Sequence, residues 1–384
     1  MKKTLFNNYL SGLRFALVSA IVLPMLVSCA TSPDVLEDPH SIIPPKPDPA
    51  GYVCYRTTGN ITTDGILNES DWEAAPWTDY FVDIEGDLKP APHYKTRLKM
   101  LWDSEYLYIA AEMEEPHIWA TLRQRDTVIF FDNDFEVFID PDGDTHNYYE
   151  LEVNAFGTSW DLLLIKPYRD GGPAVTCWDI KGLKVGTRVD GSINNPRDAD
   201  RGWNIEIAIP FSVLRECNTG PALPGQGDQW RINFSRVEWR TVIEDGRYRK
   251  ETDPSTGRPW PEYNWVWTPQ GRINMHMPEM WGYLQFSGIK AGEGTEVFVP
   301  DRDLNEKWAL RMVYYLQNEY FKKFGTYTSD IRMLGLGRDD FEGVNTLPVI
   351  RATGTTFECY FSNENGGRGW TIYHDGKIVN LSGK

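Results

Sequence analysis

The chain has 384 residues and carries 55 acidic and 39 basic side chains, which gives a formal net charge of −16. A balance this acidic argues against nucleic acid and anionic lipid as partners, and it favours neutral or cationic ligands and calcium. The length leaves room for more than one domain.

Residues 1–28 are typical of an export signal. Lys2 and Lys3 precede an apolar run that is too short and too interrupted for a spanning helix. The run ends in LVSC, which resembles a bacterial lipoprotein box and predicts that Cys29 is lipidated and holds the protein at a membrane surface. An ordinary cleaved signal is the alternative. Residues 29–50 contain several Pro and Asp residues and are expected to form a tether.

Residues 51–290 contain many runs in which apolar and polar residues alternate, as in half-buried strands. In the run DFEVFID, for example, Phe135 and Val137 share one face and Asp134 and Glu136 share the other. The predicted strands cover residues 96–102, 106–113, 134–140, 148–154, 183–189, 203–209, 230–239 and 281–286. Because no long amphipathic helix interrupts them, the fold is predicted to be mainly β, an antiparallel β-sandwich of the immunoglobulin-like or jelly-roll-like type.

The pattern changes after residue 290. Residues 306–324 have helical period, with Gly325 as a stop signal, and three short strand-like runs follow, with an Asp375-Gly376 turn inside the third. Residues 303–384 are therefore predicted to form a small α+β unit appended to the sandwich.

Several ordered blocks resemble the family 9 carbohydrate-binding module. They are DGILNESDWEAAPW, LWDSEYLYIAAEM, DFEVFIDPD and WNIEIAIPFSVL, and the likeness spans roughly residues 57–289. The resemblance implies a β-sandwich that binds sugar without catalysis. It also implies two aromatic rings around a terminal sugar.

The resemblance places the first ring at Phe131, or at Phe130 one position earlier. It places the late ring at Trp267, with Trp265 as the near alternative. Both tryptophans lie in NWVWTPQG, which is polar and flanked by loops, so their rings are expected to be exposed. A family glutamate that bonds sugar hydroxyls maps on Glu136.

Two positions depart from the family pattern. Glu152 stands where the family has an arginine, and Ser235 stands where it has a glutamine, so the family's specificity for chain-end disaccharides is in doubt. Asn154 is a further candidate for sugar hydroxyls. The alternative for this whole set is an acidic, hydrogen-bonded sheet face that carries no ligand.

A short span is crowded with acids, and calcium takes six to eight oxygen ligands. The candidate ligands are Asp132, Asp134, Asp140, Asp142 and Asp144. The spacing is not that of an EF-hand, and an Asp-Gly turn explains part of the pattern without metal. The family resemblance implies structural calcium.

The remaining cysteines and histidines carry no clear catalytic signature. Cys54, Cys177, Cys217 and Cys359 form no C-x-x-C pair, so disulfides and buried free thiols both stay open. Common hydrolase and phosphate-binding motifs are missing, although paired glutamates such as Glu136 and Glu150 leave a glycosidase as a remote alternative.

The sequence therefore predicts a non-catalytic carbohydrate-binding protein of the cell envelope, anchored through lipid at Cys29. It would present oligosaccharides or polysaccharides to separate hydrolases. The alternative from another class is an envelope scaffold that binds protein partners and no sugar.

Overall fold

Strands dominate the computed structural model, which describes residues 35–221, 223–362 and 367–381. The predicted signal and Cys29 lie outside these residues. The main strands are β1 (Gly51–Arg56), β3 (Thr96–Trp102), β4 (Tyr106–Glu114), β5 (Asp134–Asp140), β6 (Tyr148–Asn154), β7 (Ser159–Leu164), β9 (Lys184–Asp190), β10 (Gly202–Pro210), β11 (Gln229–Glu238), β14 (Tyr263–Val266) and β15 (Gly282–Lys290). All the strands predicted between residues 51 and 290 are present, within a few residues of their expected bounds.

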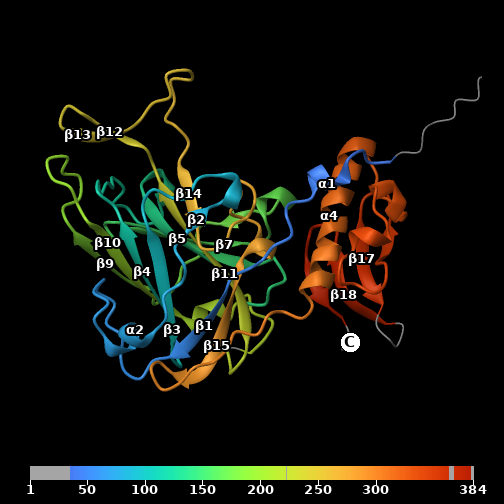
Figure 1. The fold of residues 1–384 in the computed structure, drawn as a ribbon, viewed down its shortest axis with the longest axis horizontal. Helices are drawn as coiled ribbons and strands as arrows, with labels where there is room; N and C mark the ends of the chain where they lie inside the picture. The colour runs from blue at the N-terminus through green and yellow to red at the C-terminus, as the bar shows by residue number, and fades with distance from the viewer. Residues whose placement is uncertain (1–34, 222, 363–366, 382–384) are drawn as a thin grey trace, which may run out of the picture. The chain divides into compact units, whose positions relative to one another are not determined.

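Shorter elements complete this part of the chain (Figure 1). They are strands β2 (Val82–Asp83), β8 (Ala174–Val175), β12 (Thr241–Glu244) and β13 (Arg247–Lys250), helices α1 (Pro39–Ile42), α2 (Ser70–Ala74) and α3 (Phe211–Leu214), and 3-10 turns η1 (Gly86–Leu88), η2 (Ile129–Phe131), η3 (Tyr168–Asp170) and η4 (Pro278–Met280).

One continuous sheet builds the sandwich by folding over on itself. Its strand order is β8-β7-β6-β5-β11-β15-β1-β3-β4-β10-β9, with β14 and β2 attached beside β11. Most neighbours are antiparallel, as predicted, but β1 runs parallel to both β15 and β3. The predicted mainly β sandwich is confirmed, and those two parallel pairs are its departure from a purely antiparallel arrangement.

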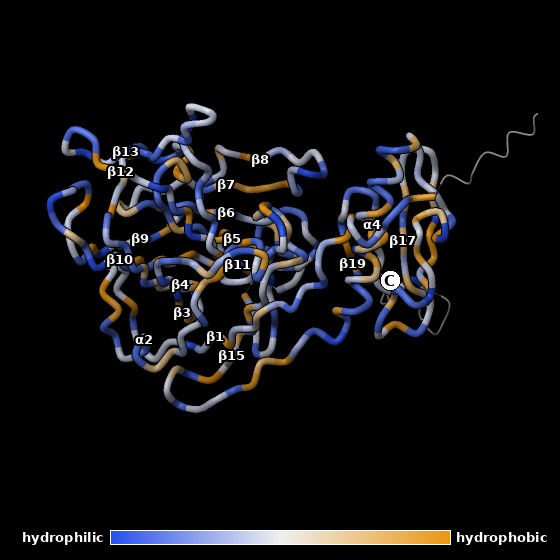
Figure 2. The backbone as a smooth tube through the Cα atoms, turned by 45° about the horizontal axis from the view of Figure 1, so that its top comes forward, coloured by the Kyte–Doolittle hydropathy of each residue, from blue (hydrophilic) through white to orange (hydrophobic). Residues whose placement is uncertain are grey.

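The core lies between the two halves of the folded sheet. Phe135 and Val137 of β5 and Phe234 of β11 pack in one cluster with Met100 of β3 and Ile207 of β10. Hydrophobic colour follows many of the strands, while hydrophilic colour follows many of the connecting loops (Figure 2). The alternation read from the sequence therefore separates the core face of each strand from its outer face.

Glu206 joins two sequence blocks that lie more than a hundred residues apart. Its carboxylate is 1% exposed and accepts the backbone N–H of Asp64 at 3.0 Å and that of Gly65 at 2.7 Å. The indole N–H of Trp72 donates to the same carboxylate at 2.7 Å. The turn before α2 is thus fixed to β10 by three hydrogen bonds to a charged acceptor.

Gly65 is required at this turn for two reasons. Its φ is +84°, in the left-handed region that favours glycine. A Cβ atom there would also lie 2.5 Å from the backbone nitrogen of Arg188. The backbone conformation and the close packing at this turn therefore explain the glycine in the DG pair of the sequence block.

The last part of the chain is α+β, as predicted. Helix α4 (Leu304–Phe324) ends at Gly325, whose φ is +74°, and it lies beside β17 and β18 (Figure 1). The other elements here are η5 (Ile331–Leu334), η6 (Arg338–Asp340), β16 (Val349–Ala352), β17 (Phe357–Ser362), β18 (Arg368–Tyr373) and β19 (Ile378–Asn380). No helix in the described part of the chain has the length and apolarity needed to cross a bilayer.

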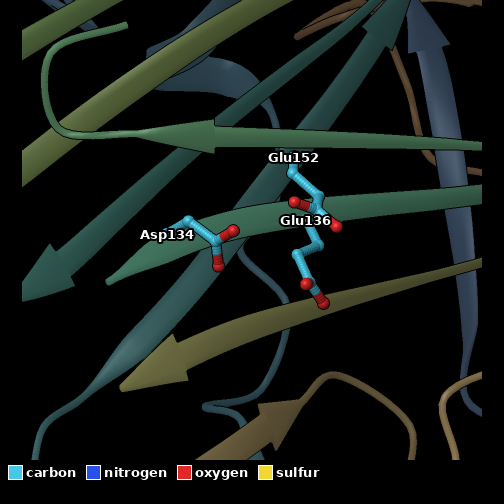
Figure 3. A group of neighbouring side chains, drawn as sticks. All are labelled: Asp134, Glu136 and Glu152. Atoms are coloured by element: carbon cyan, nitrogen blue, oxygen red, sulfur yellow. The ribbon is translucent and has the colours of Figure 1, made fainter. Parts of the chain in front are cut away.

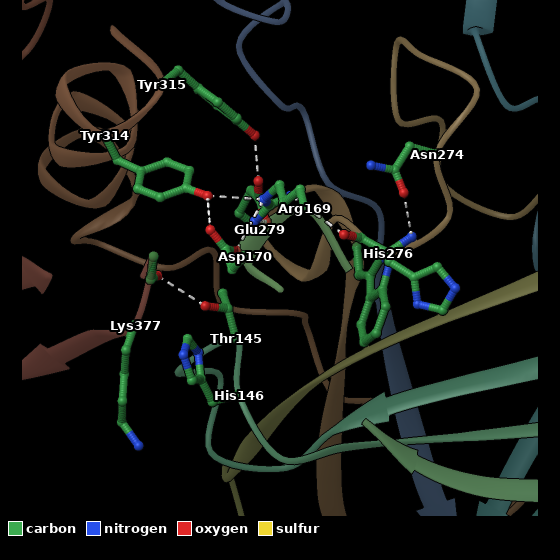
Figure 4. Close-up of polar contacts among 12 residues, drawn as sticks. Thr145, His146, Arg169, Asp170, Asn274, His276, Glu279, Tyr314, Tyr315 and Lys377 are labelled. Atoms are coloured by element: carbon green, nitrogen blue, oxygen red, sulfur yellow. Dashed lines mark hydrogen bonds and ion pairs between the residues drawn. The ribbon is translucent and has the colours of Figure 1, made fainter. Parts of the chain in front are cut away.

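Buried polar contacts connect α4 to the loops of the sandwich (Figure 4). Arg169 pairs with Glu279 at 2.9 Å, and its Nε donates to the hydroxyl of Tyr314 at 3.2 Å. The hydroxyls of Tyr314 and Tyr315 donate to Asp170 and Glu279 respectively. Because Arg169 and Glu279 are largely buried and hydrogen-bonded from both sides, removal of either would leave an uncompensated charge.

Replacement of Glu206 by Ala should destabilise the protein strongly, because it leaves three N–H donors, two of them buried, without an acceptor. We expect the free energy of unfolding to fall by about 3–5 kcal/mol in urea denaturation. Glu244→Ala, at the exposed end of β12, is the matched control and should change it by less than about 0.5 kcal/mol. A Glu206→Ala variant as stable as the control would show that this carboxylate does not hold the turn.

Candidate functional site

A row of cross-strand neighbours defines the outer face of the sheet at β5 and β6. Ser235 lies opposite Glu136, Glu136 opposite Glu152, and Glu152 opposite Trp160. Directly opposed residues in antiparallel strands point to the same side of a sheet. Asp134, Glu136 and Glu152 accordingly gather on this side (Figure 3).

A cavity of about 200 Å³ opens on this face. It is lined by Phe130, Glu136, Phe138, Glu150, Glu152, Trp160, Leu162, Tyr168, Val237, Asn264, Met275 and His276. Aromatic and aliphatic walls with a few converging polar groups are typical of small-molecule sites. The lining draws on strands β5, β6, β7, β11 and β14, on the turns η2 and η3, and on the loop before η4.

Three buried glutamates are the carboxyl groups of this cavity, and all three have raised pKa values. Burial raises the pKa of Glu136 from its ordinary 4.5 to about 7, and it raises the pKa of Glu150 and Glu152 well above the ordinary value. Glu152 is anchored, since its Oε2 accepts the backbone N–H groups of Ile129 and Phe130 at 2.9 Å each. Glu150 Oε2 is buried and has no hydrogen-bond partner among the described residues. The cavity therefore offers carboxyl groups that can bond to a ligand.

His276 lies at the wall of this cavity and is neutral at physiological pH. Burial, with the nearby charge of Arg169, lowers the pKa of His276 to about 4. Its Nδ1 shares a hydrogen bond of 2.9 Å with the hydroxyl of Tyr148, and its ring meets that of Tyr168 edge to face at 4.5 Å. Arg169 also donates to the backbone oxygen of His276 (Figure 4). Arg169, which bonds to residues of α4, therefore also bonds to a residue of the cavity wall.

Only part of the predicted ligand set lies at this cavity. Glu136 lines it, and the neighbouring Phe130 is the aromatic residue of η2 that does so. Phe131 is 52% exposed, with its ring centroid 4.7 Å from that of Phe130. Asn154 is fully buried. Its side-chain amide donates to the backbone oxygen of Leu122 at 2.8 Å and to Asp132 at 3.0 Å, so its role is structural.

The expectation of exposed rings at Trp265 and Trp267 is wrong. Trp265 is 2% exposed and Trp267 is 7% exposed, and both belong to the core cluster that contains Phe135. Val266, between them, lies opposite Ser235 on the outer face. Since side chains alternate along a strand, the tryptophans point to the side away from Glu136, and truncating Trp267 would remove core packing.

The predicted calcium ligands fall into separate places. The carboxylate of Asp132 is already hydrogen-bonded within the protein, because it accepts the backbone N–H groups of Thr121 and Leu122 at 2.7 and 2.8 Å. Asp140, Asp142 and Asp144 lie together in the turn between β5 and β6, with oxygens within 4.8 Å of one another. Asp134 lies apart from them, beside Glu136 and Glu152.

All four cysteines of the described residues are free thiols. Cys54 and Cys359 are buried, Cys217 is partly buried and Cys177 is exposed. Of the two alternatives that the sequence left open, disulfides or free thiols, the structure shows free thiols. Among the described residues the sandwich is therefore held by its core and hydrogen bonds.

Several cavity residues were missed by the sequence reasoning. The sequence reasoning does not single out Trp160, Tyr168 or Asn264. The available signal for Trp160 was the alternation in SWDLLL, which places Trp160 and Leu162 on one face of β7. Its position opposite Glu152 depends on the pairing of β6 with β7, which the sequence does not display.

Comparison with known proteins supports the family resemblance. Residues 63–229 match the family model described as carbohydrate family 9 binding domain-like. This match covers β3 to β10 and most of the cavity residues. No curated protein matches the chain.

Comparison with solved structures gives matches at low identity and low TM-score. A Bacteroides uniformis protein provisionally described as carbohydrate-binding is 16% identical, with a TM-score of 0.47, over 62% of this chain and all of that one. A family 9 carbohydrate-binding module from Caldicellulosiruptor kristjanssonii, solved with cellotriose and with glucose, is 15% identical with a TM-score of 0.39, over 65% of this chain and all of that one.

Glu136→Gln should stabilise the protein at alkaline pH. Because the folded-state pKa of Glu136 is raised to about 7, its stabilising contribution is complete below pH 4.5 and is lost as the pH rises through 7. Urea denaturation in a chelating buffer should give equal stabilities at pH 4.5 and an advantage of about 3 kcal/mol at most for the variant at pH 8. Glu293→Gln, an exposed control, should show no such trend. A Glu136→Gln advantage that does not depend on pH would contradict the raised pKa.

Proposed function

We propose that this chain binds carbohydrate without catalysis, in the cavity lined by Glu136, Glu150 and Trp160. The observation that carries the proposal is the combination of buried carboxyls and aromatic walls in one cavity, most of whose lining lies within the residues that match a carbohydrate-binding family model. The ligands of the Caldicellulosiruptor module, cellotriose and glucose, make β-linked glucose chains the first sugars to test.

The physical basis of binding is the amphipathic character of a sugar ring. The C–H face of a pyranose packs against an aromatic face and loses water there, and Trp160 and Tyr168 offer such surfaces. The hydroxyls exchange bonds to water for bonds to Glu136, Glu150 and the amide of Asn264. Each exchange gains only about 0.5–1.5 kcal/mol, so moderate affinity is expected.

The proposal also includes the place where binding occurs. The LVSC box at Cys29 supports a lipid anchor at the cell envelope. A protein held there would present oligosaccharides or polysaccharides to separate hydrolases.

Glycoside hydrolysis is the second candidate, because one observation favours it. Glu136 has a pKa of about 7 and lies in a cavity with two further glutamates, and a glycosidase needs a protonated carboxyl beside a second one. Release of shorter products from cello-oligosaccharides, lost in Glu136→Gln, would establish this function in place of simple binding.

A glycan array on the soluble chain from Pro49 onward should show selective binding, and calorimetry should then give the affinity. Trp160→Ala should weaken that affinity about tenfold, which is ~1.4 kcal/mol, because the ring face is lost. The matched control is Trp77→Ala, since Trp77 is also half-buried but stacks on Arg97 away from the cavity. Equal loss in both variants would disprove the assigned cavity, and silence across the array from folded protein would favour the scaffold function.

A further inference from the structure

A second cavity, of about 160 Å³, lies between helix α4 and the sandwich. Leu304, Trp308 and Arg311 of α4 line it, and their spacing of three or four residues places them on one face of the helix. Arg231 of β11 and Tyr283 of β15 line it from the sandwich. Leu304 is partly exposed, so the cavity is open to solvent on this side.

Arg311 carries hydrogen-bond donors that have no acceptor. Its side chain is 2% exposed, and its Nε and Nη1 atoms are buried without a hydrogen-bond partner among the described residues. The guanidinium carbon lies 5.1 Å from the ring centre of Tyr314, a contact that attracts the charge but supplies no lone pair to the N–H groups. Because buried donors are almost always satisfied in native proteins, these point to an acceptor from outside the chain.

The acids near Arg311 are bonded to other groups. Although burial opposes it, the charges of Arg169 and Arg311 lower the pKa of Glu279 to about 2, so this carboxylate is ionised. Its oxygens accept from Arg169 at 2.9 Å and from the hydroxyl of Tyr315. Asp170 is likewise paired with Arg169, at 3.4 Å. These acids attract Arg311 by their charge and leave its N–H groups without an acceptor.

Arg231 brings a second buried cation to the cavity. Its side chain is 7% exposed, and its guanidinium carbon lies 3.8 Å from the ring centre of Tyr283. Its Nη1 donates to the backbone oxygen of Trp281 at 2.5 Å. Neither Arg231 nor Arg311 forms an ion pair with any residue that the structure describes. Two buried arginines therefore face one cavity without a carboxylate bound to either.

The other charged groups of the lining already have partners. Lys307 is paired with Asp301 at 2.7 Å, and the same carboxylate accepts the hydroxyl of Tyr283 at 2.8 Å. Asp142 accepts the backbone N–H of Thr219 at 3.3 Å. The donors that still lack an acceptor are thus those of an arginine, which identifies the missing group as an anion.

We propose that this cavity binds a small organic acid, whose carboxylate bonds to Arg311 with Arg231 as the second cation. A planar guanidinium pairs with a planar carboxylate through two parallel N–H bonds. The apolar walls of Leu304 and Trp308 suit a carbon skeleton better than an inorganic anion. The volume equals that of about five water molecules, at ~30 Å³ each, so the acid is a single small molecule such as a monosaccharide acid.

This site is separate from the cavity beside Glu136. The two linings share no residue, and the Glu136 cavity contains carboxyl groups where this one contains arginines. The acidic cavity would repel a carboxylate, whereas the α4 cavity attracts it. Binding of an acid here therefore does not depend on binding of neutral sugar there.

The test is calorimetric titration of sodium D-glucuronate into the full chain at pH 7.5, in a buffer free of other carboxylates. The result expected is saturable uptake of one molecule per chain. Acetate, the bare carboxylate, should compete with glucuronate, and neutral D-glucose should not.

Variants assign the binding to Arg311. Arg311→Met removes the N–H donors at similar length and should weaken glucuronate binding at least tenfold, because the charge-assisted bonds are lost. Arg311→Lys keeps the charge without the planar fork, should weaken binding severalfold, and covers the case in which Arg311→Met does not fold. The matched control is Arg302→Met, an exposed arginine just before α4, which should leave the affinity within twofold.

Three results would overturn the site. They are no glucuronate uptake by the folded wild-type chain, full affinity in both Arg311 variants, and binding of inorganic phosphate with no binding of glucuronate or acetate. Glucuronate uptake that depends on Arg311, without binding of any neutral sugar, would leave this site standing and disprove only the proposed function.

Discussion

The alternation of side chains along β5 and β6 is the constraint on which the rest of the structure depends. The same backbone repeat that places Phe135 and Val137 in the core places Asp134 and Glu136 on the outer face. A shift of one residue would bury the carboxylates in the core and expose the aromatic rings, so the register is strongly specified. The acidic face is therefore built into the strands that also form the centre of the sandwich.

Much of the fold could be predicted because its signals are local. The strand pattern, the helix that ends at Gly325 and the Asp375-Gly376 turn each depend on neighbouring residues, and the structure contains them all. The bonds of Glu206 to the DG turn and to Trp72 explain why two separate sequence blocks occur together. The parallel pairing of β1 was not predictable, since it joins strands far apart in the chain.

The candidate site was predicted less well because it depends on pairing between strands. Glu136 was identified correctly as a residue of the acidic face. Polar neighbours made Trp267 look exposed, but β14 pairs with β11 so that this side of the strand faces the core. Trp160 reaches the site only through its place opposite Glu152. Which face a tryptophan occupies is decided by its partner strand, and one sequence does not contain that information.

The central claim is that sugar binds in the cavity beside Glu136. The most direct measurement is a crystal structure of the protein soaked with cellotriose in the presence of calcium. The account predicts a sugar ring packed on Trp160, with hydroxyls within hydrogen-bond distance of Glu136 or Glu150. Sugar bound elsewhere on the chain, with this cavity holding only water, would contradict it.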